Sequence, residues 1–224
     1  FVGGARGQSA GLFLQTSEGT FRAAPGEAFV ADQSFEDVDA AFFDADGDGD
    51  QDLYVVSGGS SEVRPSAYRD RLYLNDGTGT FEPASADALP AIESSGGAVA
   101  VHDYDGDGDP DLFVGGRVRP NSYPLSPRSY LLENTGGRFR DATKQVSEAL
   151  LRPGMVTDAR WHDLTGNGTR ELILAGEWMS LRVFQQNDTG GFTEKTDSLR
   201  LGRSSGWWNA LAIADFDGDG DPDI

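Results

Sequence analysis

The sequence predicts an all-β fold built from repeated four-stranded units, and three observations support this prediction. A loop rich in Asp and Gly recurs about every 50 to 60 residues, each time after a short apolar segment. A second motif, in which apolar residues alternate around a turn of Asn, Asp, Thr and Gly, is typical of a β-hairpin. Glycine is abundant, with 30 residues among 224, which favours many tight turns.

The acidic loop has four copies that align without gaps. Three copies carry a carboxylate at every second position over nine residues, whereas the third copy along the chain keeps only its first and last carboxylates. The leading aspartates are Asp44, Asp103, Asp163 and Asp215. This regularity indicates one structural unit that is repeated along the chain.

Each acidic loop is expected to join the first two strands of its unit. In the first unit, strand A covers 38–43 and strand B covers 53–56, while strands C and D flank the hairpin at 72–74 and at Phe81. A large residue two positions before each leading aspartate, preceded mostly by alanine, suits a sheet packed between neighbouring sheets. A four-stranded unit of this length predicts a β-propeller blade.

We expect a single propeller segment with about four repeats over residues 1–224. It divides into a partial blade at 1–30, blades at about 31–90, 91–150 and 151–205, and the start of a next blade at 206–224. Two arrangements fit this register. A window of a larger propeller is favoured, because the sequence breaks inside a strand B; a four-bladed ring, in which N- and C-terminal strands share one blade, is the alternative.

The acidic loops are expected to bind Ca²⁺. Carboxylates at this spacing repel one another unless they are solvated or share a cation, and Gly47 and Gly49 let the first loop curl at positive φ. The loops contain no His or Cys, so a hard cation is favoured. Calcium accepts six to eight oxygens at flexible angles, whereas magnesium demands an octahedron. Acidic turns without a metal are the alternative.

The predicted ligands contribute side-chain oxygens at positions one, three, five and nine and a carbonyl at position seven. In the three fully acidic loops the predicted metal residues are Asp44, Asp46, Asp48, Asp50, Asp52, Asp103, Asp105, Asp107, Asp109, Asp111, Asp215, Asp217, Asp219, Asp221 and Asp223. In the third loop they are Asp163, Thr165, Asn167, Thr169 and Glu171. This loop has lost formal charge, so its site is expected to be weak or empty.

An EF-hand begins with a similar pattern, but it needs a carboxylate at position 12 and helices on both sides. Position 12 is Val55, Val114 or Leu174 here, and the flanking segments are strand-like. The loops, the apolar strand ending in Gly-Gly and the segment Asn-Asp-Gly-Thr-Gly-Thr-Phe together resemble the FG-GAP/VCBS repeat, which builds the propeller of integrin α subunits.

This resemblance covers essentially the whole chain and implies a propeller with calcium in the loops between strands A and B. Longer stretches look most like bacterial secreted proteins with an ASPIC/UnbV domain, relatives of cartilage acidic protein. The loops that begin at Asp44, Asp103 and Asp215 match the repeat position by position. The loop that begins at Asp163 departs at three positions, which puts its metal in doubt.

Charge and hydropathy exclude some partners. The formal net charge is −19, which argues against nucleic acid and against an anionic membrane surface. No apolar run approaches the roughly 20 residues that span a bilayer, so no membrane insertion is expected. An extracellular or cell-surface location is expected for a calcium-binding propeller of this kind. The oligomeric state stays open.

His102 and His162 directly precede a leading aspartate, where the other two copies have Phe43 and Ala214. A packing role is therefore expected for both histidines. No nucleophile elbow and no phosphate-binding loop with a lysine is present. Paired carboxylates alone do not exclude glycosidase chemistry, but all of them fall in the expected metal loops. We therefore expect no enzymatic activity from this chain.

The tryptophans are assigned by their position in the repeat. Trp161, Trp207 and Trp208 lie on or just before strand A, so they are expected in the core. Trp178 follows strand B and is expected to be exposed.

The loops after strand B, at 57–71 and 115–128, are long, and both contain Arg-Pro and Tyr. In an antiparallel blade they lie on the face opposite the acidic loops, where long loops often bind ligands. The candidate ligand-binding residues are Arg64, Tyr68, Arg69, Arg117, Arg119 and Tyr123. In the alternative, Arg64 and Arg119 bind carbonyls of their own loops.

These features predict a calcium-binding module that recognises a protein or an anionic glycan. Two alternatives stay open: a propeller scaffold of a polysaccharide-active enzyme, and a structural spacer of a large adhesin. The fold alone does not choose among them.

Overall fold

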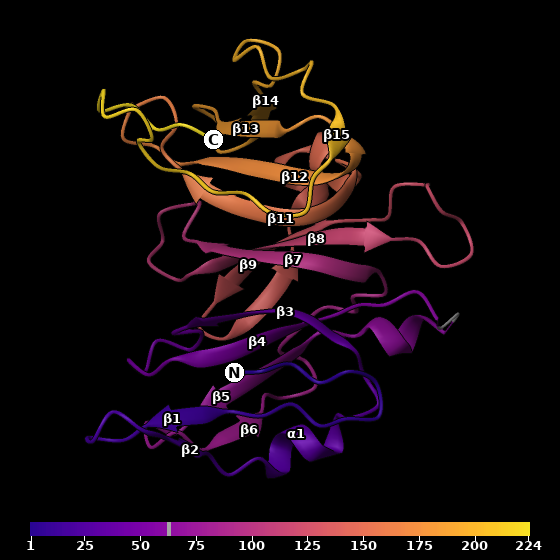
Figure 1. Ribbon diagram of the computed structural model, residues 1–224, viewed down its shortest axis with the longest axis vertical. Helices are drawn as coiled ribbons and strands as arrows, with labels where there is room; N and C mark the ends of the chain where they lie inside the picture. The colour runs from indigo at the N-terminus through magenta and orange to yellow at the C-terminus, as the bar shows by residue number, and fades with distance from the viewer. Residues whose placement is uncertain (62–63) are drawn as a thin grey trace.

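The computed structural model describes residues 1–61 and 64–224 and consists almost entirely of antiparallel sheets stacked along the long axis of the molecule (Figure 1). The first sheet is a hairpin of β1 (Phe13–Gln15) and β2 (Phe21–Ala23). The second contains β3 (Asp37–Phe43), β4 (Asp52–Ser57), β5 (Arg71–Asn75) and β6 (Phe81–Pro83).

The other two sheets repeat this order. The third contains β7 (Ser95–His102), β8 (Asp111–Val118), β9 (Tyr130–Thr135) and β10 (Arg138–Asp141). The fourth contains β11 (Met155–His162), β12 (Glu171–Met179), β13 (Arg182–Gln186) and β14 (Phe192–Glu194), with β15 (Gly206–Trp207) added to β12. Each four-strand meander is a propeller blade, so the predicted fold class and the order of strands A to D are confirmed.

Helical structure is confined to connections. In the part of the chain that the structure describes, it comprises α1 (Glu27–Ala31), α2 (Thr143–Val146) and two 3₁₀ turns at Pro65–Tyr68 and Glu148–Leu151. Among the described residues, no helix is long and apolar enough to cross a membrane.

The cores lie between the sheets. All six residues of β4 are buried, as are the first six of β8 and the first seven of β12, because each of these strands is covered on both faces. Tyr54 and Val56 of the second sheet share one core with Leu112 and Val114 of the third. A second core joins the third and fourth sheets in the same way, and a third lies between the hairpin and the second sheet. Packing between blades therefore provides most of the burial.

The Gly-Gly pair at the end of strand B allows close approach of the neighbouring chain. A Cβ at Gly116 would lie 2.2 Å from the carbonyl oxygen of Arg128, and one at Gly115 would lie 2.6 Å from a methyl carbon of Val156. A larger residue at Gly115 would push against the next blade, and one at Gly116 would displace the segment before β9 in the same blade.

The two ends of the chain lie apart, and the structure is an open run of sheets (Figure 1). Val2 forms a bridge with Gly11, and Ala214 forms one with Asp223, so no ladder joins the ends among the described residues. The four-bladed ring is therefore not the arrangement seen.

At the last acidic loop the first strand is represented by a single bridge between Ala214 and Asp223, which pairs the same positions as Phe43 with Asp52 in the second sheet. Before it, β15 pairs with the end of β12, where Trp207 lies opposite Glu177. The reason is the length of β12: β13 pairs only with residues 172–174, which leaves the rest of that edge open to β15. The first strand of the segment at 206–224 thus extends the preceding sheet.

Candidate metal loops and the opposite loop face

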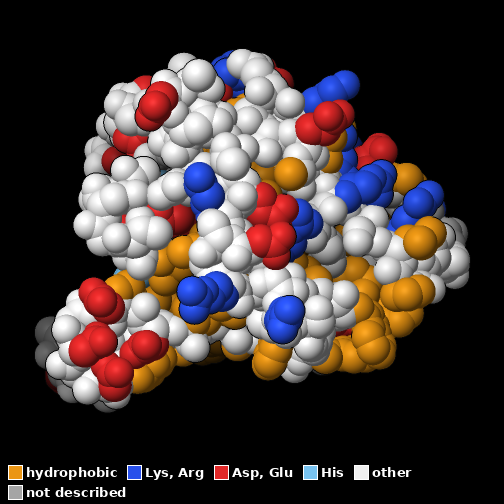
Figure 2. Space-filling model, turned by 90° about the horizontal axis from the view of Figure 1, so that it is seen from above, with side chains coloured by type: hydrophobic (Ala, Val, Ile, Leu, Met, Phe, Trp, Pro, Cys, Tyr) orange, Lys and Arg blue, Asp and Glu red, His pale blue; other side chains and the backbone are white. Residues whose placement is uncertain are grey.

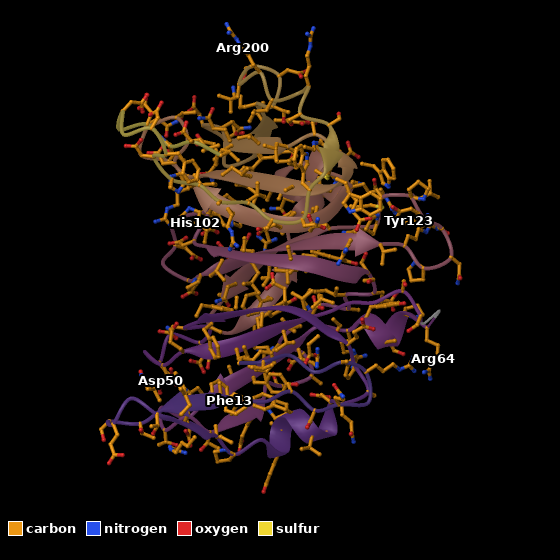
Figure 3. The ribbon with its side chains drawn as sticks, viewed as in Figure 1. Phe13, Asp50, Arg64, His102, Tyr123 and Arg200 are labelled. Carbon is orange, nitrogen blue, oxygen red and sulfur yellow. The ribbon has the colours of Figure 1, made fainter. Side chains whose placement is uncertain are left out.

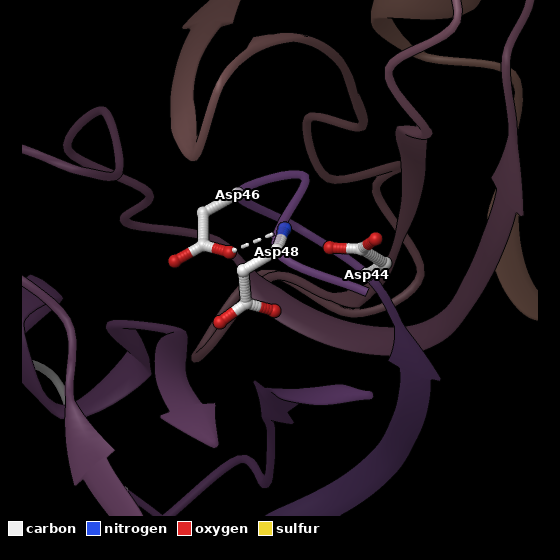
Figure 4. Close-up of side chains that lie close together, drawn as sticks. All are labelled: Asp44, Asp46 and Asp48. Atoms are coloured by element: carbon white, nitrogen blue, oxygen red, sulfur yellow. Dashed lines mark hydrogen bonds between the residues drawn. The ribbon is translucent and has the colours of Figure 1, made fainter. Parts of the chain in front are cut away.

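Three acidic loops bring carboxylates together at the end of the first strand of a blade. In the first loop, oxygens of Asp44, Asp46 and Asp48 lie within 4.8 Å of one another (Figure 4). Two further loops form such groups, consisting of Asp103, Asp105 and Asp111, and of Asp215, Asp217 and Asp223. The sequence therefore identified loops in which several carboxylates converge.

The backbone of each loop curls around its leading aspartate. The two carboxylate oxygens of Asp44 accept hydrogen bonds from the N–H groups of Gly47, at 2.8 Å, and Gly49, at 3.0 Å. Both glycines have positive φ, +80° and +94°, which explains why other residues would be strained here. Asp103 and Asp215 make the same pair of bonds in their own loops.

The last carboxylate of each loop has a structural role that the sequence analysis missed. Asp52 is fully buried; its Oδ2 accepts the N–H of Ala45 and its Oδ1 accepts the N–H of Asn75, both at 2.8 Å. Asp111 bonds Tyr104 and Asn134 in the same way. This residue therefore ties the acidic loop to the third strand of its blade. The sequence did contain a sign of this role, because a carboxylate recurs at the first position of the second strand in each blade.

In the second loop, position seven is Asp109, and its side chain points toward a neighbouring hairpin rather than toward the centre of the loop. The side chain of Asp109 accepts the N–H of Gly136 at 2.9 Å, in the hairpin between β9 and β10. The side chain of Asp109 is thus engaged by the hairpin, and a carbonyl ligand at position seven remains a prediction.

Burial and mutual repulsion make the ionised loops costly without a cation. Burial raises the pKa of Asp111 to about 7, and the charges of Asp105 and Asp107 add to the increase. Burial is also the main cause that raises the pKa of Asp52 and Asp105. A cation among these oxygens would favour the ionised forms. Oxygen-only donors at this spacing fit calcium.

The third loop differs because two of its predicted metal ligands, Thr165 and Glu171, form a hydrogen bond with each other. The Thr165 hydroxyl donates to Oε1 of Glu171 at 3.0 Å, and Gln185 donates to the same oxygen at 2.9 Å. Oε2 of Glu171 accepts the N–H of Leu164. Asp163 still accepts the N–H groups of Asn167 and Gly168. These bonds occupy oxygens that the other loops leave to their carboxylate groups, and the weaker site remains a prediction.

The loops after the second strand lie on the opposite face. In Figure 3, Asp50 of the first acidic loop and His102 lie on one side, whereas Arg64 and Tyr123 lie on the other. Figure 2, seen from above, shows acidic side chains on a projecting lobe at the lower left and hydrophobic ones along the lower right, with further acidic side chains between them. The first acidic loop and the loops after the second strand therefore lie on opposite sides of the molecule.

The predicted ligand-binding residues fall into two groups on this face. Those that are exposed are Arg64, Arg69, Arg117, Arg119 and Tyr123. Tyr68 is only 3% exposed, so the expectation that it lies on this surface is wrong. It ends a 3₁₀ turn whose apolar side packs against the blade, which a loop pattern does not reveal.

Arg117 is held by the next blade rather than by its own loop. Its Nε and Nη2 donate to Oε1 of Glu177 at 3.2 and 3.0 Å, while the Tyr123 hydroxyl donates to Oε2 at 3.2 Å. Glu177, which the sequence analysis did not consider, therefore accepts hydrogen bonds from two of the predicted ligand-binding residues.

His102 packs as expected. Its ring lies 5.0 Å from that of Trp161, centroid to centroid, and burial lowers its pKa, with the charge of Arg170 adding to the decrease. Trp207 and Trp208 were expected in the core, but they are 52% and 40% exposed, so that expectation is wrong. β15 is paired on one edge only in the described structure, and its indoles remain uncovered.

Comparison with known proteins supports the same fold. Residues 44–114 and 163–224, more than half of the chain, match the FG-GAP-like repeat. No curated protein matches the chain.

A similar solved structure is that of a lectin from Agrocybe aegerita, described as specifically recognising non-reducing terminal N-acetylglucosamine. It is 18% identical, with a TM-score of 0.50 over 90% of this chain and 50% of the lectin chain, so this chain spans about half its length. At this identity the likeness concerns the fold. The narrower resemblance to proteins with an ASPIC/UnbV domain stays a prediction. The match over most of the repeats places the chain in the FG-GAP-like repeat family.

Proposed function

We propose that the chain is a calcium-stabilised propeller module of a secreted or surface protein, and that it recognises a glycan or a protein. The observation that carries this proposal is the separation of the two loop sets, with carboxylates converging on one face and exposed arginines and aromatic residues on the other. One face would stabilise the fold, and the other would be left free to bind.

The calcium part of the proposal is supported by charge. The chain carries a formal charge of −19, and several carboxylates converge in each of three loops. Extracellular calcium modules typically have dissociation constants of about 10⁻⁴ to 10⁻³ M, so such sites would fill outside the cell. This favours a secreted or surface location.

The recognition part is supported by the exposed residues of the second face and by the likeness in fold to a lectin. Arg64, Arg69 and Arg119 are exposed there, and guanidinium groups bind carboxylates and sulfates bidentately. Arg117 is already paired with Glu177, which weakens the case for an anionic ligand at that position. We propose a binding role rather than a catalytic one, because the clustered carboxylates would be engaged by cations.

A glycan panel tests this proposal. The protein should bind at least one immobilised oligosaccharide in millimolar calcium, lose binding in excess chelator, and regain it when calcium is restored. Magnesium at the same concentration is the control for ionic strength, and it should restore less binding. Failure to bind any oligosaccharide in calcium, with the protein folded by circular dichroism, would remove the glycan half of the proposal.

A further inference from the structure

Three large aromatic side chains are exposed together on the face opposite the acidic loops. Tyr123, in the loop after β8, is 51% exposed; Trp178 of β12 is 64% exposed, and Trp207 of β15 is 52% exposed. The rings of Trp178 and Trp207 lie 5.1 Å apart, centroid to centroid, with their planes inclined by 59°. The two indoles therefore form an open corner, and Tyr123, which contacts Trp178, lies at its edge. Figure 3 shows Tyr123 on the side away from Asp50.

Hydrogen bonds hold two of these rings, those of Trp178 and Tyr123, in place. Nε1–H of Trp178 donates to the Tyr123 hydroxyl at 2.6 Å, and that hydroxyl donates to Glu177 at 3.2 Å. Arg117 holds the other oxygen of Glu177, so the chain of bonds runs from the third sheet to the fourth. The polar atom of the Trp178 indole is thus satisfied, and its exposed surface is the ring itself.

The backbone at Trp178 is strained. Its φ is +57°, in the left-handed region that a bulky residue rarely adopts, although it lies within a strand. Trp178 lies seven residues after Glu171, the last residue of its acidic loop. In the first blade, the residue seven positions after the corresponding Asp52 is Gly59, whose φ is +89°. Glycine meets this backbone requirement without strain. A tryptophan that is both strained and exposed stabilises the fold poorly, and such strain is concentrated at functional sites.

We infer that this aromatic corner, defined by Tyr123, Trp178 and Trp207, binds a neutral saccharide. This inference rests on the proposed function and names its site and ligand class. The flat ring faces match the C–H face of a pyranose, while the Arg117 guanidinium and the Tyr123 hydroxyl at the edge can bond its hydroxyl groups.

The charge of the site favours a neutral ligand. The Arg117 guanidinium, which is linked to the corner through Glu177 and Tyr123, has its charge balanced by Glu177 and offers little attraction to a sulfate or carboxylate. The formal charge of −19 on the whole chain also repels anions. An organic cation is disfavoured because Arg117 lies beside the rings and already neutralises the nearby carboxylate.

The test compares Trp178→Gly with Phe21→Ala. The first removes the ring and the backbone strain together, so its melting temperature should equal or exceed that of the wild type. The second removes an aromatic residue that is 67% exposed on β2, outside the corner. The probes are neutral oligosaccharides ending in N-acetylglucosamine, galactose, glucose or mannose, together with sulfated counterparts and a proline-rich peptide.

The wild type should bind at least one neutral probe, Trp178→Gly should bind it at least tenfold more weakly, and Phe21→Ala should bind it unchanged. Equal binding by Trp178→Gly would overturn the inference and leave the proposed function intact. Binding of no oligosaccharide by the wild type would overturn the glycan function itself. Binding of the sulfated probes alone, or of the peptide through Trp178, would contradict a neutral saccharide. Dimers by light scattering that Trp178→Gly dissociates, without loss of sugar binding, would assign the corner to self-association instead.

Discussion

Arg117 and Glu177 occupy the same position in two consecutive blades, and the guanidinium of the first holds the carboxylate of the second at 3.0 Å. Each lies six residues after the final carboxylate of its acidic loop, Asp111 or Glu171, where the first blade has Gly58. Opposite charges at equivalent positions therefore join the blades on the face away from the acidic loops.

Replacing Arg117 by alanine should destabilise the protein. Glu177 is only 7% exposed, and it would keep only the hydrogen bond from Tyr123 on one oxygen. An unsatisfied buried acceptor costs about 1–3 kcal/mol, and partial exposure of Arg117 places the expected loss near the lower limit. Urea unfolding measures it. Arg69→Ala, an exposed arginine on the same face, is the control, and equal losses in both variants would contradict a specific role for the pair.

Asp39 joins two blades through the backbone. Its Oδ2 accepts the N–H of Val99 at 2.8 Å, and the equivalent Asp158 accepts the N–H of Leu211 at 2.7 Å. Asp39→Ala should therefore lower the free energy of unfolding by about 1–3 kcal/mol, because the Val99 N–H loses its partner. Asp188→Ala, at an exposed hairpin, should change it by less than about 0.5 kcal/mol. Similar stability of the two variants in urea would show that the bond does not support the interface.

Asp70 should make stability depend on pH. It is 3% exposed and accepts hydrogen bonds from Ser57 N–H and the Tyr54 hydroxyl; burial raises its pKa from 3.8 to about 7, although these bonds lower it in part. Between those values the folded protein keeps a proton that the unfolded chain loses. The contribution of Asp70 to stability therefore falls as pH rises through this window, by up to about 1.4 kcal/mol per unit.

Asp70→Asn is neutral at every pH and removes this dependence. Its free energy of unfolding should increase relative to the wild type from about pH 4 to about pH 7, measured in urea at fixed calcium. A difference that stays constant over this range would show that Asp70 is ionised throughout it.

The third acidic loop should gain calcium affinity from added carboxylates. Thr165→Asp with Asn167→Asp restores the pattern of the other loops, so titration calorimetry should detect one more calcium ion per chain. In chelator the same variant should be less stable than the wild type, because the new carboxylate at 165 lies near Glu171. An unchanged stoichiometry would contradict the proposed ranking of the loops.

The repeated pattern predicted most of the strands because it is local. Strands around the first acidic loop begin and end within about one residue of the prediction, and the carboxylates of three loops converge as their spacing required. The contacts between blades were not predictable in this way. Asp39 and Val99, or Arg117 and Glu177, are 60 residues apart, and nothing in their local pattern names the partner.

Exposure was the least predictable property. Tyr68 is buried by the blade beneath its turn, whereas Trp207 is exposed because β15 joins the edge of β12 instead of starting a strand that is covered on both faces. Both outcomes depend on which neighbour covers a residue, and a single repeat does not contain that information.

Thermal unfolding with and without calcium shows whether the acidic loops bind calcium as part of the fold. A cation that binds only the folded state adds about 2.7 kcal/mol when its free concentration is 100 times the dissociation constant. For a chain of this size, that amounts to a rise in melting temperature of about 5–10 °C for each filled site. The melting temperature should rise clearly when millimolar calcium is added to chelated protein, and less when magnesium is added. Coincident melting curves in chelator and in calcium would contradict this expectation.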